Sequence, residues 1–189
     1  MGEFCVNLRV FLDGGPEFFY TRITDIEWRY YVVFSVGDKV VYPMHGAGTI
    51  QGIEEMKILG EKKQYYIFKL PCSDMNIMMP VDSGDMVGVR DIVAKEVIED
   101  VVGLLRSEST PMQKNWSRRH RENTEKLKTG DILQVAEVVR NLMRMDRVRG
   151  LSAGERKLMY TARQILTSEM ILAGDMTEDE AVKLIEESV

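Results

Sequence analysis

The stretch "VGDKVVYPMHGAGTIQGIEEM", residues 36–56, decides how the chain folds. Apolar residues alternate with polar ones around Gly37 and Asp38, and further glycines supply bends, which is typical of short strands joined by tight turns. Two β-prone runs follow, "KQYYIFKL" at 63–70 and "MNIMMPV" at 75–81, and a hairpin loop with Gly60 at its tip is expected before the first of them. About five strands in so short a span predict a compact bent sheet or a small barrel.

The chain that follows residue 90 has the apolar spacing of helices. The pairs Ser152–Glu155 and Thr177–Glu180 have the spacing of capping boxes, which predict two helix starts. Five helices are expected, in 91–106, from near Trp116 to about 128, in 131–150, in 152–174 and in 177–188. Strands followed by helices indicate the α+β class, with two consecutive domains at 34–90 and 91–189.

Composition bounds the function classes that fit this chain of 189 residues. No run of about 18 apolar residues exists, so no membrane-spanning helix is expected, and neither is a secretory signal. Two cysteines and two histidines (Cys5, Cys72, His45 and His120) lack metal-ligand spacing, so neither a metal nor a cofactor is expected. Since no nucleophile–base pair or phosphate-binding loop is found, we expect that the protein is not an enzyme. Both thiols are interpreted as reduced cysteines, which is typical of a cytoplasmic protein.

Charge is distributed unevenly along the chain, although the net charge is only -5. Residues 112–163 contain 13 Lys and Arg against 6 Asp and Glu, whereas residues 164–189 contain 1 against 7. A basic segment between two acidic ones is consistent with an anion-binding face or with the solvated surface of helices.

The segment "NWSRRHREN", residues 115–123, places Trp116 among cations. If Ser117 caps the helix, the hydrophobic-staple position is occupied by Arg121, so a local apolar partner for the ring is missing. Three interpretations remain: a ring buried by a distant partner, a cation–π contact with its own arginines, and a surface that binds nucleic acid. The candidate nucleic-acid contacts are Lys114, Trp116, Arg118, Arg119, Arg121, Lys126 and Lys128.

Several of these segments, taken together and in order, resemble the CarD/CdnL family of bacterial transcription regulators that bind RNA polymerase. The carrying segments are "FSVGDKVVYPMHGAGTI", "MVGVRD", "NWSRRHRENTEKLKTGD", "VAEVVRNL" and "RGLSAGERKLMYTARQIL", and the match runs from about Phe34 to about Ile171. The resemblance implies a Tudor-like N-terminal module that binds the polymerase β subunit, and a helical domain that contacts promoter DNA at the upstream edge of the melted bubble. It implies a monomer whose Trp116 acts as a minor-groove wedge against bubble collapse.

The resemblance also implies where the polymerase contact lies. Members carry arginines at the positions of Met56 and Met78, so in this chain either the acidic partner surface differs or the contact is more apolar. Met56, Met78 and Met79 are first of all consistent with a strand core, and the alternative is an adaptable apolar contact surface, since methionine repacks readily. The candidate polymerase contacts are Met56, Lys57, Ile58 and Met78, with Lys63 as a further source of charge.

Two other functions remain open alongside this interpretation. One is an architectural DNA-binding protein that acts without polymerase, whose binding would be weak and steeply salt-dependent. The other is an adaptor for a different partner, in which Trp116 would be incidental.

Residues 1–33 have no counterpart in the family. Trp28 and Arg29 can be encoded by TGGAGG, which contains a ribosome-binding sequence, and a valine at 32 or 33 can be a GTG start. We therefore hypothesise that the residues before Val32 or Val33 are untranslated leader. The alternative is a native extension that adds a strand or an arm.

Overall fold

The computed structural model describes residues 11–12, 15–16, 34–58, 61–72, 76–81 and 88–189. The chain divides into two compact units, Met1–Tyr31 and Val32–Val189. In the first unit, β1 (Phe11–Leu12) pairs antiparallel with β2 (Gly15–Pro16). The start-site hypothesis concerns residues 28–33, which lie outside the described residues.

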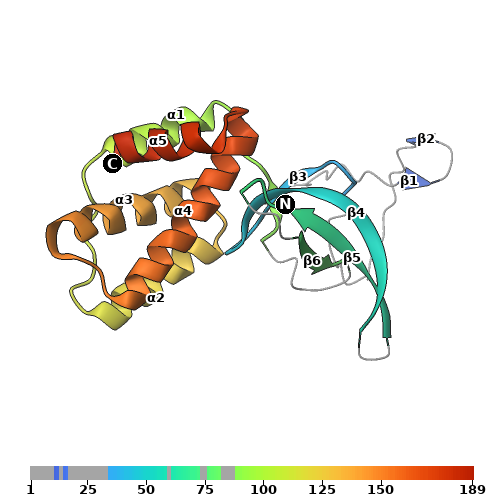
Figure 1. The fold of residues 1–189 in the computed structure, drawn as a ribbon, viewed down its shortest axis with the longest axis horizontal. Coiled ribbons are helices and arrows are strands. Elements are labelled where there is room, and N and C mark those ends of the chain that lie inside the picture. Colours follow the sequence, from blue (N-terminus) through green and yellow to red (C-terminus); the bar gives the residue numbers. More distant parts are fainter. Residues whose placement is uncertain (1–10, 13–14, 17–33, 59–60, 73–75, 82–87) are drawn as a thin grey trace, which may run out of the picture. The chain divides into compact units, whose positions relative to one another are not determined.

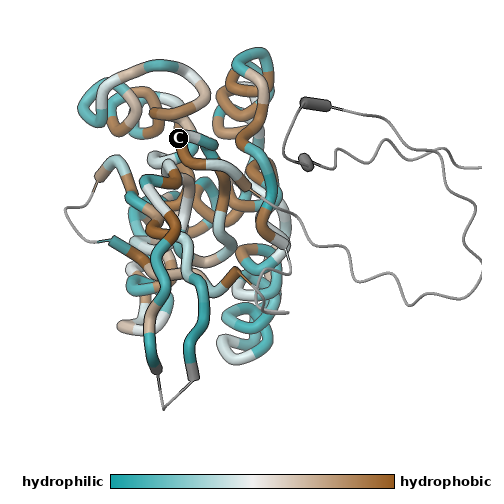
Figure 2. The backbone as a smooth tube through the Cα atoms, turned by 90° about the vertical axis from the view of Figure 1, so that its right-hand side faces the viewer, coloured by the Kyte–Doolittle hydropathy of each residue, from teal (hydrophilic) through white to brown (hydrophobic). Residues whose placement is uncertain are grey.

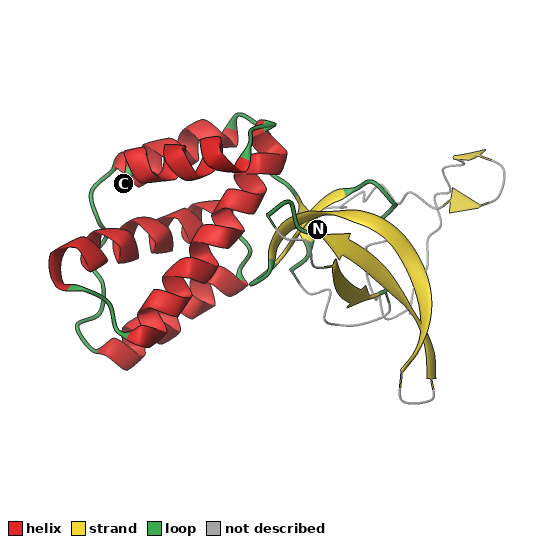
Figure 3. Ribbon diagram, viewed as in Figure 1, coloured by secondary structure: helices red, strands yellow, loops and turns green. Residues whose placement is uncertain are grey.

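The second unit opens with one antiparallel sheet in the strand order β6-β5-β4-β3-β7. Figure 1 labels β3 to β6 of this sheet, and Figure 3 shows the strands in yellow. Its strands are β3 (Lys39–Tyr42), β4 (Gly46–Ile58), β5 (Glu61–Lys69), β6 (Asn76–Pro80) and β7 (Arg90–Asp91). The expected hairpin is present, because β4 and β5 pair up to Ile58 and Glu61, while the expected tip at Gly60 lies outside the described residues. The sheet remains open, so of the two predicted forms it is the bent sheet.

The bend has two local causes in β4. The register with β5 shifts between Ile50 and Gly52, which is a bulge that lets one strand curve against its neighbour. At Gly48, a Cβ would lie 2.4 Å from the carbonyl oxygen of Lys69, so only glycine allows the two backbones to approach this closely. A small core on the sheet is formed by Phe34, Val40, Ile50, Tyr66, Phe68, Met79 and Val89.

Five helices follow the sheet, as predicted: α1 (Val97–Arg106), α2 (Trp116–Lys128), α3 (Ile132–Arg149), α4 (Ala153–Gly174) and α5 (Glu178–Ser188). Both expected capping boxes are formed, at Ser152–Glu155 and at Thr177–Glu180. The prediction that the first helix covers 91–106 is wrong at its start. Residues Arg90–Asp91 pair with β3 as a short strand, and the helix begins six residues later, at Val97.

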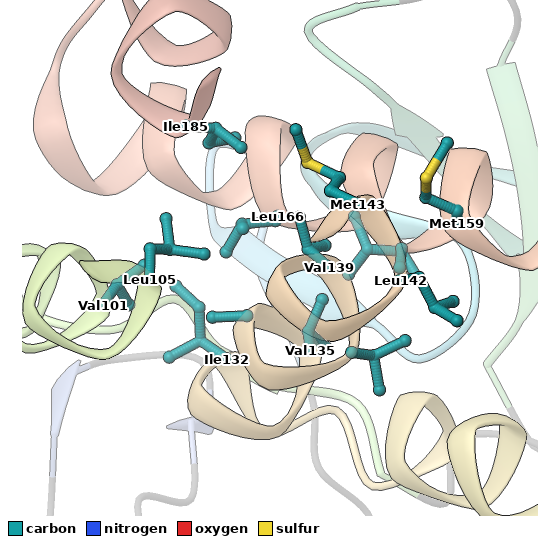
Figure 4. Close-up of a cluster of buried hydrophobic side chains, with 14 of the residues drawn as sticks. Val101, Leu105, Ile132, Val135, Val139, Leu142, Met143, Met159, Leu166 and Ile185 are labelled. Carbon is teal, nitrogen blue, oxygen red and sulfur yellow. The ribbon is translucent and has the colours of Figure 1, made fainter. Parts of the chain in front are cut away.

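The helices enclose the larger apolar core of the chain. Side chains from α1, α3, α4 and α5 meet there, as the close-up in Figure 4 shows for residues such as Leu105, Val139, Leu166 and Ile185. Figure 2 shows the same division, with hydrophobic colours gathered between the helices and mostly hydrophilic colours where β4 and β5 approach residues 59–60. The stability of this part of the chain therefore rests mainly on burial between helices.

Hydrogen bonds connect the strands to α4 within the unit Val32–Val189. The backbone N–H of Ala47 donates to the Ser168 hydroxyl at 2.8 Å. The Arg90 guanidinium donates to both carboxylate oxygens of Glu169, at 2.7 and 2.9 Å. Since β7 spans residues 90 and 91, the division into domains 34–90 and 91–189 stays a prediction.

Candidate nucleic-acid interface

The start of α2 is set by Asn115 and not by Ser117, which the sequence suggested as a cap. The Asn115 side-chain oxygen accepts a hydrogen bond from the Arg118 N–H at 3.1 Å, and the Asn115 backbone is extended, as a cap residue requires. Trp116 is therefore the first residue of the helix. This position puts its ring at the very end of α2, where the helix can no longer bury it completely.

Trp116 lies at the surface, with 51% of its area exposed. Its indole N–H donates to the Ser152 hydroxyl at 2.7 Å, and its ring lies 5.8 Å from the His120 ring, centre to centre. A Cβ built on Gly154 would lie 3.5 Å from the Trp116 ring, so the start of α4 packs against one side of the ring. Within the described residues no arginine stacks on the ring, so of the three interpretations the structure favours a surface tryptophan.

Three of the predicted basic contacts surround the same end of α2. Lys114, Arg118 and Arg121 are exposed, and none of them forms an ion pair within the part of the chain that the structure describes. Cations without protein partners keep their full charge available to a phosphate. These three residues and Trp116 are hereafter called the α2 patch.

Arg119 departs from the expectation of a nucleic-acid contact. Its side chain is 5% exposed, and its guanidinium pairs with the buried Glu155 carboxylate, with Nε and Oε1 2.7 Å apart. Burial alone raises the pKa of Glu155, but hydrogen bonds from Ser152 and Arg119 outweigh it and lower the pKa. The charge of Arg119 is neutralised inside the protein by Glu155. Arg119 is therefore a buried residue beneath the α2 patch and is not one of its exposed cations.

Lys126 and Lys128 lie at the other end of α2. At 1.5 Å per residue they are roughly 15 to 18 Å from Trp116 along the helix axis. Lys126 pairs with Glu137 of α3 at 2.7 Å, and Lys128 pairs with Glu125 at 3.0 Å. The structure therefore separates these two lysines from the α2 patch and gives each a carboxylate partner.

The connection between α3 and α4 is the neighbour of Trp116 that the sequence did not reveal. Ser152 was identified only as a helix cap, and its contact with the indole joins residues 36 positions apart. Four exposed basic residues lie within five positions of Ser152: Arg147, Arg149, Arg156 and Lys157. The excess of basic residues in 112–163 was the available signal, but it could not say which of them would share a surface.

The predicted polymerase contacts lie on the sheet. Met56 pairs with Lys63 and Met78 pairs with Ile67, and strand alternation places all four on the sheet face opposite the Tyr66 and Phe68 core. Met78 is 49% exposed, whereas Met79 is fully buried in the core. Lys57 pairs with Lys62 and so lies on the other face from Met56. The Ile58 side chain lies outside the described part of the structure.

The remaining candidate groups are His45, the two cysteines and any acidic or histidine cluster. His45 stacks on Tyr42, with ring centres 4.6 Å apart. Burial, and then the charge and hydrogen bonding of Glu178, raise the pKa of the Cys72 thiol to about 11, while Cys5 lies outside the described residues. Among the residues described, no group of three or more His, Cys, Asp or Glu could hold a metal ion. None of the helices described is both long and apolar enough to cross a membrane.

Comparison with known proteins matches both the sheet and the helices of the second unit. Residues 34–93 match the model of the "CarD-like/TRCF RID domain", and residues 100–186 match "CarD, C-terminal domain". The chain is 39% identical over 149 residues to the "Putative transcription factor YdeB" of Bacillus subtilis (strain 168), which covers 77% of this chain and 95% of that protein. The chain belongs to the CarD-like family. This confirms the resemblance seen in the sequence and supports a role in transcription regulation for this CarD-like protein.

Proposed function

We propose that this CarD-like protein binds the β subunit of bacterial RNA polymerase through its sheet and stabilises the open promoter complex through the α2 patch. The observation that carries the proposal is that Trp116 is half-exposed at the start of α2, and that this end of the helix also carries the exposed Lys114, Arg118 and Arg121, which have no ion-pair partner among the described residues. The protein acts as a monomer in the cytoplasm, without a cofactor and without catalysing a reaction. Membership of the CarD-like family supports this choice over a polymerase-independent role.

The proposed division of labour follows from the chemistry of each group. Guanidinium and ammonium groups neutralise phosphates and release counterions, which gives affinity without sequence preference. A large flat ring can wedge between base steps from the minor groove and so oppose closure of the melted segment. Since polymerase holds the protein near the DNA, the contact becomes intramolecular, and a small basic patch is enough.

The wedge is tested by the lifetime of the open complex formed by polymerase holoenzyme on a promoter whose complex decays quickly. Trp116→Ala should shorten the lifetime by about fivefold or more, since stacking of a base on an aromatic ring contributes about 1–3 kcal/mol. Tyr160→Ala is the matched control, because Tyr160 is an aromatic residue of α4 with 57% exposure and about 12 Å of helix between it and Ser152. Equal lifetimes for wild type and Trp116→Ala would remove the wedge from the proposal.

The salt dependence of DNA binding separates the polymerase-bound role from an architectural one. The purified protein should bind promoter duplex weakly and lose that binding steeply between about 50 and 200 mM salt. With polymerase present, its effect on the open complex should persist at the higher salt. Tight binding of the protein alone at physiological salt, with no change in open-complex lifetime, would favour the architectural function.

The polymerase contact is tested with an isolated fragment of the β subunit. Met56→Ala combined with Met78→Ala should weaken binding by about tenfold or more, since burying a methionine contributes up to about 1.5–3 kcal/mol. Ile53→Ala is the matched control: Ile53 is apolar and 45% exposed, but it pairs with Tyr66 and so lies on the opposite face. If the double methionine variant and Ile53→Ala both bind the fragment as tightly as wild type, the polymerase contact is assigned to the wrong face of the sheet. An adaptor role for another partner then becomes the better hypothesis.

A further inference from the structure

The orientation of the Trp116 ring is set by a hydrogen bond to a different helix. The indole N–H is the only hydrogen-bond donor of a tryptophan side chain, and here it donates to the Ser152 hydroxyl at 2.7 Å. A half-exposed ring at a helix end would otherwise be able to change rotamer. The bond therefore selects one direction for the ring before any partner binds.

Ser152 is itself held in place by Glu155. The hydroxyl donates to the Glu155 carboxylate at 2.8 Å and accepts the Glu155 backbone N–H at 3.3 Å, as well as the indole N–H. A serine hydroxyl has one donor and two acceptor sites, so all three are used. The hydroxyl cannot turn away from the indole without losing a bond to the start of α4.

Arg119 closes the network behind Trp116. It donates to the second Glu155 oxygen at 2.7 Å and to the carbonyl oxygens of Gln113 and Lys114, which lie just before Trp116 in the chain. The ring of Trp116 is thus connected to the buried Glu155 carboxylate through Ser152, and the backbone that precedes Trp116 is connected to the same carboxylate through Arg119. The start of α2 and the start of α4 are thus joined by hydrogen bonds at the ring.

We propose that Ser152, held by Glu155 and Arg119, is a positioning residue that fixes the Trp116 ring in its outward orientation before DNA is bound. This inference rests on the proposed wedge function of Trp116. Fixing a side chain in advance removes part of the entropy that binding would otherwise cost. Because its only donor is occupied, the indole does not read base-edge acceptors in the minor groove, so the wedge acts through ring shape and stacking.

The test is a double-mutant cycle read out as open-complex lifetime with polymerase holoenzyme. Ser152→Ala should shorten the lifetime by about two- to tenfold in the wild-type background, the range expected from one hydrogen bond. In a Trp116→Phe background, which has a ring but no N–H, Ser152→Ala should have no further effect. Ser152→Thr keeps the hydroxyl and should restore most of the lifetime.

Loss of the helix cap is controlled by Thr177→Ala. Thr177 and Glu180 form the same capping box at the start of α5, so this variant loses an equivalent cap without touching the Trp116 network, and the lifetime should not change. The indole N–H of Trp116 can also be followed by NMR in a Trp28→Phe protein. It should shift upfield and exchange faster with water when Ser152 is replaced by alanine.

Two outcomes overturn the inference in distinguishable ways. If Ser152→Ala shortens the lifetime equally in both backgrounds, or in neither, the serine does not act through the indole, and only the positioning role fails. If Trp116→Ala itself leaves the lifetime unchanged, the wedge function fails and the positioning role fails with it.

Discussion

Removal of Arg90 should destabilise the protein far more than removal of a typical surface cation. Glu169 is 1% exposed at its side chain, and its carboxylate accepts two hydrogen bonds from Arg90 and one from the Val93 N–H at 3.2 Å. Arg90→Ala leaves this buried charge with the Val93 bond alone. Breaking a buried pair in this way costs about 3–5 kcal/mol. Arg90 also donates to the carbonyl oxygen of Gly130, and the loss of that contact adds to the effect.

A loss of this size is a large fraction of a total stability of about 5–15 kcal/mol. The measurement is urea unfolding at neutral pH, followed by circular dichroism, with the change read from the midpoint and the slope. Lys62→Ala is the control, since Lys62 forms an ion pair with Glu55 at 2.6 Å while both side chains are more than half exposed. We expect this control to lose about 0.5 kcal/mol or less.

The double variant Arg90→Ala with Glu169→Ala distinguishes a buried charge from simple loss of packing. When both partners are removed, no unpaired charge remains, so the double variant should lose less stability than the sum of the two single variants. A loss below about 1 kcal/mol in Arg90→Ala, or strict additivity of the two changes, would show that water reaches Glu169 and would refute the reasoning.

Three further predictions follow from single sites. Gly154→Ala should raise the stability by up to about 1 kcal/mol in thermal unfolding, since the added Cβ makes only ordinary contacts inside a helix, and a loss would contradict the contact geometry. In a Cys5→Ser background, the Cys72 thiol, with its pKa raised to about 11, should react slowly with a thiol reagent at pH 8 and faster after Glu178→Gln. The pKa of Glu155 is lowered in the fold from its ordinary value of 4.5, so its stabilisation is complete above that value and is lost as pH falls through the folded pKa. The difference in unfolding free energy between wild type and Glu155→Gln, measured by urea unfolding at a series of pH values, should therefore shrink below about pH 4. A difference that stays constant with pH would contradict a lowered pKa of Glu155.

Local patterns predicted those features of the chain whose physics is local. Strand alternation and glycine placement gave the bent sheet, and the two capping boxes formed where their spacing indicated. The start of the first helix was missed because the apolar residues Ile92 and Val93 fit a helical stripe equally well. Residues just before them pair with β3 instead, so a long-range strand contact overrides the local pattern.

The composition of the candidate site was visible in the sequence, but its arrangement was not. The sequence alone determined the α+β order, the family, and Trp116 with its surrounding cations, because these depend on residue type and spacing along one segment. Only the tertiary structure decided that Arg119 is buried against Glu155 while Arg118 and Arg121 remain exposed, and that Ser152 holds the indole. The reason is that only one side of α2 packs against the rest of the protein. Glu155 of α4 selects Arg119 as the basic residue on that side, and it lies 36 positions further along the chain, beyond the reach of a local pattern.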